Sequence, residues 1–131
     1  MQLYVDTSAL VKLVTAEPES AALRSYLSEA GGDAEFTAAI TRTELMRAAD
    51  RLRDADIARQ ATLLLTRLHF VEISIALLDA AAVLPPPELR ALDAIHLAAA
   101  LTAPDLSALV TYDRRLADAA ANAGLVVVSP S

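Results

Sequence analysis

The sequence contains no cysteine and few aromatic residues, and each absence narrows the possible structures. Without cysteine, the chain can form neither a disulfide framework nor a thiolate metal site. Aromatic residues make up 4% of the 131 residues, whereas hydrophobic residues make up 55%. We therefore expect a core of Ala, Leu, Val and Ile, a composition that suits helices packed on a sheet.

Long apolar segments and an excess of positive charge are also missing. No apolar run approaches the roughly 20 residues of a membrane span, and the first ten residues lack the basic and apolar parts of a signal peptide. We expect a soluble, cytoplasmic protein with no membrane association. The net charge of −6 argues against a broad basic surface for nucleic acid. A nucleic-acid enzyme fits this charge only if acids gather around cations and basic residues are grouped locally.

Short apolar runs alternate along the chain with segments of helical spacing. Strands are expected at residues 3–5, 35–38, 69–73, 107–112 and 125–129. Because strands that alternate with helices imply right-handed crossovers, the pattern predicts an α/β fold with a parallel sheet. No repeat or linker divides the chain, so residues 1–131 are expected to form one domain.

Two acidic residues directly follow predicted strands. Asp6 follows the first strand, and Asp113 follows the fourth. Either could simply cap the next helix, but parallel sheets bind ligands at the carboxyl ends of their strands. If these two strands are neighbours, their ends lie about 5 Å apart. Like charges at that separation need a cation between them, or one carboxyl group must be protonated.

Two further acids lie on helices with apolar surfaces. Glu44 borders the apolar stripe of its helix, and a surface ion pair with Arg47 is the simpler explanation for it. Asp93 begins a helix that is apolar on nearly every face, so its carboxylate needs a partner. It is expected to be either a helix cap or a buried functional acid. His96, one turn later, could be a metal ligand or a general base, but its apolar surroundings are more typical of a satisfied core histidine.

Four acid-containing segments resemble, in order and spacing, the motifs of PIN-domain ribonucleases. The closest likeness is to the VapC-type toxins of bacterial and archaeal toxin–antitoxin pairs. The segments are "YVDTSALVKL", "TRTELMRA", "LRALDAIHLAAAL" and "LVTYDRRLADAA". The resemblance covers nearly the whole chain and implies a PIN-like three-layer α/β/α sandwich. Its five-stranded parallel sheet would have the order 3-2-1-4-5.

The resemblance also implies a site and a chemistry. Its acidic pocket would bind Mg²⁺ or Mn²⁺ through Asp6, Glu44, Asp93 and Asp113, supported by the hydroxyl groups of Thr7, Ser8 and Thr111. Oxygen ligands without cysteine favour these cations over zinc. A metal-activated water would hydrolyse the RNA phosphodiester, so no side-chain nucleophile is needed. Basic residues close to these acids are candidate RNA contacts or ordinary surface charges: Lys12, Arg42, Arg47, Arg114 and Arg115.

A toxin of this type would have defined partners. We expect a single-stranded or looped RNA substrate such as tRNA or rRNA, a VapB-like antitoxin, and a homodimer formed through helices at residues 18–27 and 56–68. One alternative is a phosphoacceptor receiver domain, but "DTS", "SIALL" and "SPS" follow the first, third and fifth strands where that class needs acidic or lysine residues. The other alternative is a catalytically silent PIN-like module that binds RNA or protein. The intact set of four acids argues against this alternative.

Overall fold

A computed structural model describes all residues from 1 to 131 and contains five strands and seven helices. The strands are β1 (Gln2–Val5), β2 (Ala34–Ala38), β3 (His69–Val71), β4 (Leu106–Val110) and β5 (Val127–Val128). The helices are α1 (Thr7–Val14), α2 (Ser20–Glu29), α3 (Thr41–Arg51), α4 (Ala55–Leu65), α5 (Ile75–Ala82), α6 (Ala91–Ala100) and α7 (Arg114–Asn122). None of these helices combines the length and apolar character needed to cross a membrane.

All five strands are parallel and have the order β3-β2-β1-β4-β5, which confirms the predicted sheet. β1 lies at the centre, where Tyr4 pairs with Phe36 of β2 on one side and with Leu109 of β4 on the other. At the carboxyl end of β1, Val5 pairs with Val110. The residues that follow these two strands therefore emerge side by side.

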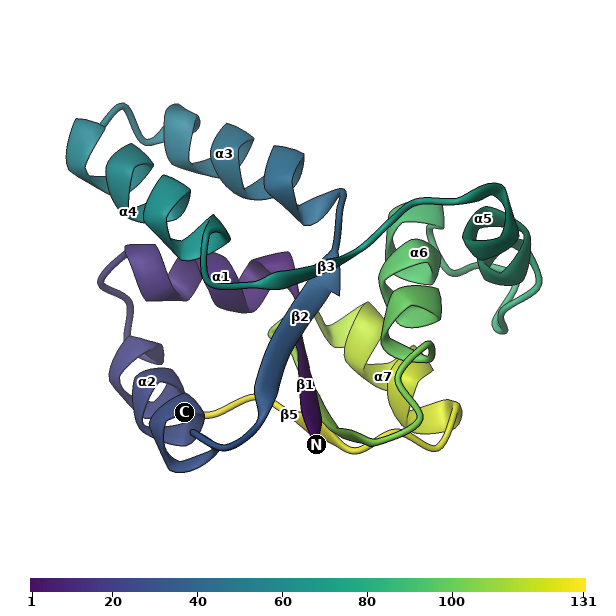
Figure 1. The fold of residues 1–131 in the computed structure, drawn as a ribbon. Helices are drawn as coiled ribbons and strands as arrows, with labels where there is room; N and C mark the ends of the chain where they lie inside the picture. Colours follow the sequence, from purple (N-terminus) through teal and green to yellow (C-terminus); the bar gives the residue numbers. More distant parts are fainter.

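Helices cover both faces of the sheet and produce three layers (Figure 1). Because side chains alternate along a strand, Leu3 and Val5 of β1 point into the core on the α1–α4 side. Tyr4 points to the opposite face, into the core built with α6 and α7. Tyr4 is thereby placed beneath α6, the helix that carries Asp93 and His96.

The buried core consists mainly of alanine, leucine and valine, with Tyr4 and Phe36 as its buried aromatic residues. This matches the composition-based expectation except for isoleucine, because no isoleucine is fully buried. Small alanines on α6 and α7 allow these helices to lie close to the sheet. A close, rigid fit of α6 is important because its first turn carries Asp93.

All five predicted strands differ from the structure at one or both ends, and the last three are shorter than predicted. The third, predicted at residues 69–73, ends at Val71. The fifth strand is limited to Val127–Val128 because it lies at the sheet edge and pairs only with β4. The fourth ends at Val110, although the Thr111 backbone N–H still donates to the Val128 carbonyl group of β5. The Thr111 side chain lies at the end of β1, where it contacts Asp6.

Candidate active site

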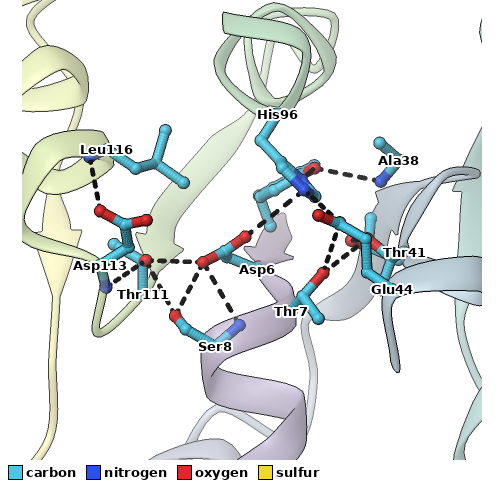
Figure 2. Close-up of polar contacts among 12 residues, drawn as sticks. Asp6, Thr7, Ser8, Ala38, Thr41, Glu44, His96, Thr111, Asp113 and Leu116 are labelled. Carbon is cyan, nitrogen blue, oxygen red and sulfur yellow. Dashed lines mark hydrogen bonds and ion pairs between the residues drawn. The ribbon is translucent and has the colours of Figure 1, made fainter. Parts of the chain in front are cut away.

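Asp6 lies at the centre of the polar contacts drawn in Figure 2. It directly follows β1, caps the N-terminus of α1, and is only 4% exposed. Its Oδ2 accepts hydrogen bonds from Ser8 Oγ at 2.7 Å and from Thr111 Oγ1 at 2.8 Å. Asp6 therefore caps α1, which is one of the two possibilities that its position left open, and its carboxylate is held at the carboxyl end of β1, where ligand binding was the other.

The same hydroxyl groups tie the β4–α7 turn to α1. Ser8 Oγ accepts a hydrogen bond from the Tyr112 backbone N–H at 2.9 Å, and Thr111 Oγ1 accepts one from the Asp113 backbone N–H at 3.0 Å. Asp113 in turn caps α7, and its Oδ1 accepts the backbone N–H of Arg115 at 2.9 Å. The turn is thus fixed at both ends relative to Asp6.

Glu44 approaches the site from the first turn of α3. Its Oε1 accepts a hydrogen bond from Thr7 Oγ1 at 2.8 Å and lies 2.7 Å from His96 Nε2. It makes no ion pair with Arg47, so the surface-pair interpretation of Glu44 was wrong. Burial acts to raise the pKa of the Glu44 carboxyl group, but the hydrogen bonds and charge of His96 and Thr7 outweigh this effect and lower the pKa.

Asp93 lies in the first turn of α6 but does not cap it, because the N-cap position belongs to Arg90. The Asp93 side chain is partly buried and makes no hydrogen bond or ion pair within the chain. Its pKa is raised, first by burial and then by the negative charges of Asp113 and Asp6. The charged neighbours of this acid therefore include two further carboxylates, whose effect His96 and Arg90 offset only in part, because the Asp93 pKa remains raised.

His96 lies one turn after Asp93 and is 3% exposed. Its Nε2 lies between two site acids, 2.7 Å from Glu44 Oε1 and 3.6 Å from Asp6 Oδ1, and its Nδ1 is 2.5 Å from the Tyr4 hydroxyl group. Burial acts to lower the His96 pKa, but Glu44 and Asp6 outweigh this effect and raise it. The sequence interpretation of a satisfied, buried histidine holds, although its partners belong to the site itself.

The candidate RNA-contacting residues differ in their surroundings. Lys12 Nζ pairs with Glu17 at 3.1 Å and with Glu19 at 2.9 Å, and lies over the Tyr112 ring. The Lys12 charge is therefore compensated within the chain. The guanidinium group of Arg42 lies over the Phe70 ring. Exposed guanidinium groups without an ion pair belong to Arg47, Arg114 and Arg115.

The donor set of the site consists of carboxylate and hydroxyl oxygens, which suits a hard divalent cation. No three of the acidic and histidine side chains converge closely enough to form a ready-made metal site. However, the negative charges of Asp113 and Asp6 both act on the Asp93 carboxyl group and contribute to its raised pKa. A cation bound among them would offset this repulsion, so the residues fit Mg²⁺ or Mn²⁺ in charge and in ligand type.

Comparison with known proteins identifies the family. The PIN domain family matches residues 3–122. Ribonuclease VapC35 and ribonuclease VapC46 of Mycobacterium tuberculosis are each 44% identical to this chain over 131 residues. Both matches cover 98% of this chain, and they cover 96% of VapC35 and 98% of VapC46. Ribonuclease VapC47 of the same species is 40% identical, covering 98% of the chain and 96% of the relative.

A solved structure supports the fold independently of close sequence identity. The crystal structure of Mycobacterium tuberculosis VapC20, described as a sarcin–ricin loop cleaving toxin, has a TM-score of 0.74 and 18% identity. The match covers 98% of this chain and 100% of VapC20. Taken with the strand order and the acids at the strand ends, the sequence matches show that this chain belongs to the PIN-domain family, among its VapC-type ribonucleases.

Proposed function

We propose that this chain is a Mg²⁺- or Mn²⁺-dependent endoribonuclease and the toxin of a toxin–antitoxin pair. Relatives named as ribonucleases are 40–44% identical to it over nearly its whole length. The observation that carries the proposal is the position of Asp93, whose side chain is partly buried and whose pKa is raised first by burial and then by the negative charges of Asp113 and Asp6. Carboxylates gathered at the ends of β1 and β4 suit a cation-dependent reaction on a phosphodiester.

The residues divide into ligands and supports. Asp6, Asp93, Asp113 and Glu44 would hold the cation through their carboxylate oxygens. Hydrogen bonds engage Asp6 only at Oδ2 and Glu44 only at Oε1. Glu44 Oε2 has no partner within the chain, and the nearest charged group to Asp6 Oδ1 is His96 Nε2 at 3.6 Å. A bound divalent cation supplies a Lewis acid and lowers the pKa of water that it holds. The protein contributes fixed orientation, because Ser8, Thr111 and Thr7 restrain the two carboxylates.

The exposed guanidinium groups of Arg47, Arg114 and Arg115 would contact the RNA backbone on either side of the acids. Arg42, exposed at the start of α3, would contribute in the same way, whereas Lys12 is already paired with two glutamates. A site at strand ends needs an exposed backbone, so we propose a single-stranded or looped substrate in tRNA or rRNA rather than a duplex.

The proposed partners follow from the same site. The negative charge of Asp6, Asp93 and Asp113 would attract a basic side chain from a VapB-like antitoxin. The bound antitoxin would then prevent the cation and the RNA from binding. We also propose that the toxin acts in the cytoplasm and forms a homodimer through α2 and α4. Sedimentation analysis of the toxin alone and with an antitoxin would test both associations.

The direct test is cleavage of tRNA and rRNA fragments by the wild-type chain with Mg²⁺, with Mn²⁺ and with EDTA. Cleavage should require the cation and should be lost in Asp93→Asn and Asp6→Asn. The matched control is Asp79→Asn, because Asp79 is an exposed acid on α5. Cleavage that persists in EDTA or in Asp93→Asn would refute the metal site. RNA binding without any cleavage would instead support the catalytically silent module.

A further inference from the structure

The buried contacts of His96 connect the centre of the sheet to the acidic site. Tyr4 is fully buried in β1, and its hydroxyl group accepts a hydrogen bond from the Ala38 backbone N–H at 3.1 Å. The same hydroxyl lies 2.5 Å from His96 Nδ1. At the other side of the ring, Nε2 lies 2.7 Å from Glu44 Oε1. Four elements, β1, β2, α6 and α3, therefore meet through one imidazole ring.

The partners of the ring determine which nitrogen carries a proton. Nε2 lies near two carboxylate oxygens, of Glu44 and Asp6, and a lone pair directed at them would be repelled. A proton on Nε2 instead donates to Glu44. The Tyr4 oxygen already accepts from Ala38, so in the neutral ring its O–H donates to Nδ1. The donation to Glu44 is the same if both nitrogens carry protons.

This arrangement fixes one half of the Glu44 carboxylate. Oε1 receives His96 Nε2–H and the Thr7 hydroxyl, whereas Oε2 has no hydrogen-bond partner in the chain. No buried side-chain oxygen in the structure lacks a partner, so Oε2 is reached by solvent. The ring also lies 3.6 Å from Asp6 Oδ1, between the two acids that flank it.

We propose that His96, held by Tyr4, is a positioning residue that directs Glu44 Oε2 into the acidic site and keeps Glu44 and Asp6 together. This role rests on the proposed ribonuclease function and goes beyond it, because it gives a positioning role to residues that contact neither RNA nor cation. His96 itself takes part in no bond-making or bond-breaking step. Its contribution is to hold an acid in the orientation that the site requires.

The test uses two substitutions that keep different parts of the imidazole. In His96→Gln the amide can replace Nε2 and donate to Glu44, whereas in His96→Asn it reaches only the position of Nδ1. His96→Asn and Tyr4→Phe should lower kcat and weaken Mn²⁺ affinity on the order of 10- to 100-fold, with a smaller change in KM. His96→Gln should recover most of that loss. His69→Gln, at an exposed position of β3, is the matched control and should behave as wild type.

Thermal unfolding identifies variants that lose activity through misfolding. The ¹H–¹⁵N spectrum of the His96 ring gives a readout that needs no catalysis, and it should show a proton on Nε2 in the wild type. Equal losses in His96→Asn and His96→Gln at equal thermal stability, or a proton on Nδ1 alone, would overturn the proposal. If the wild-type chain cleaves no RNA, the proposed function fails, and the ring spectrum and the Mn²⁺ affinities then support or overturn the positioning role.

Discussion

The Thr111 hydroxyl group donates a hydrogen bond to Asp6 Oδ2 at 2.8 Å, across 105 positions of sequence. Thr111 follows β4 and Asp6 follows β1, and the two strands are neighbours because the crossovers place β4 beside β1. Thr111 Oγ1 also accepts the Asp113 backbone N–H. One hydroxyl group therefore couples two site acids, and the coupling depends on the strand order.

Thr111→Val should show how much this coupling contributes to stability and to cleavage, because valine keeps the shape of the side chain and removes the hydroxyl group. The substitution deprives Asp6 of a donor and the Asp113 N–H of its acceptor, so we expect a loss of about 1–3 kcal/mol in the free energy of unfolding. Cleavage should fall roughly 10- to 100-fold. Urea unfolding and RNA cleavage measure the two effects. The control Thr43→Val, at an exposed position without a side-chain hydrogen bond, should change stability by less than about 0.5 kcal/mol.

Asp93→Asn should abolish cleavage without destabilising the protein in EDTA. The Asp93 pKa is raised above its ordinary value of 3.8, so the folded state holds this proton more tightly than the unfolded state. The contribution of Asp93 to stability therefore falls as pH rises from 3.8 through the folded-state pKa. Asparagine carries no charge at neutral pH, so the variant avoids this loss of stability. Its free energy of unfolding in urea at neutral pH should be equal to or greater than that of the wild type. A clear destabilisation would mean that the charge of Asp93 stabilises the fold.

Adding Mn²⁺ should stabilise the wild-type chain, since a ligand that binds only the folded state shifts the unfolding equilibrium. At a free concentration of about 100 times its Kd, the gain is about 2.7 kcal/mol. Asp93→Asn should lose most of this gain, whereas Asp79→Asn should keep it. Thermal unfolding across a Mn²⁺ titration measures the difference. An equal gain in both variants would place the cation elsewhere.

The Glu44–His96 pair should contribute most to stability in mildly acidic solution. The Glu44 pKa is lowered from 4.5, so its contribution is present above that pH and is lost as pH falls through the folded-state pKa. The His96 pKa is raised from 6.5, so its contribution is fully present below that pH and is lost as pH rises through the folded-state pKa. The stability difference between wild type and Glu44→Gln in EDTA should therefore be greatest between pH 4.5 and 6.5. A difference that does not vary with pH would contradict this assignment.

Arg114→Ala should raise KM for RNA more than Lys12→Met does, because Arg114 is exposed and unpaired whereas Lys12 is engaged by two glutamates. Each lost phosphate contact should lower the slope of log KM against log salt concentration by about 0.7 for a single strand. The exposed Arg59, paired with Asp56, provides the control Arg59→Ala. Equal KM values for Arg114→Ala and Arg59→Ala would show that Arg114 does not contact the RNA.

The positions of the strand-end acids could be predicted from the sequence better than the contacts of the helical ones. Asp6 and Asp113 were predictable because a residue just after a parallel strand must emerge at one edge of the sheet. The Glu44–Arg47 pair was wrong because local spacing cannot show that α3 turns Glu44 towards α6. The contacts of His96 could not be predicted from the sequence either, since Tyr4 and Glu44 lie 92 and 52 positions away from it.

Periodicity and local composition were sufficient to predict the alternation of strands and helices and the aliphatic core, and the four acidic motifs could be found in order along the chain. Which polar atoms meet depends on the three-dimensional packing. Strand order brought Thr111 to Asp6, and the packing of α6 on the sheet placed His96 between Tyr4 and Glu44. These contacts join residues far apart in the chain, and they form only because hydrophobic burial on both faces of β1 holds the helices in place.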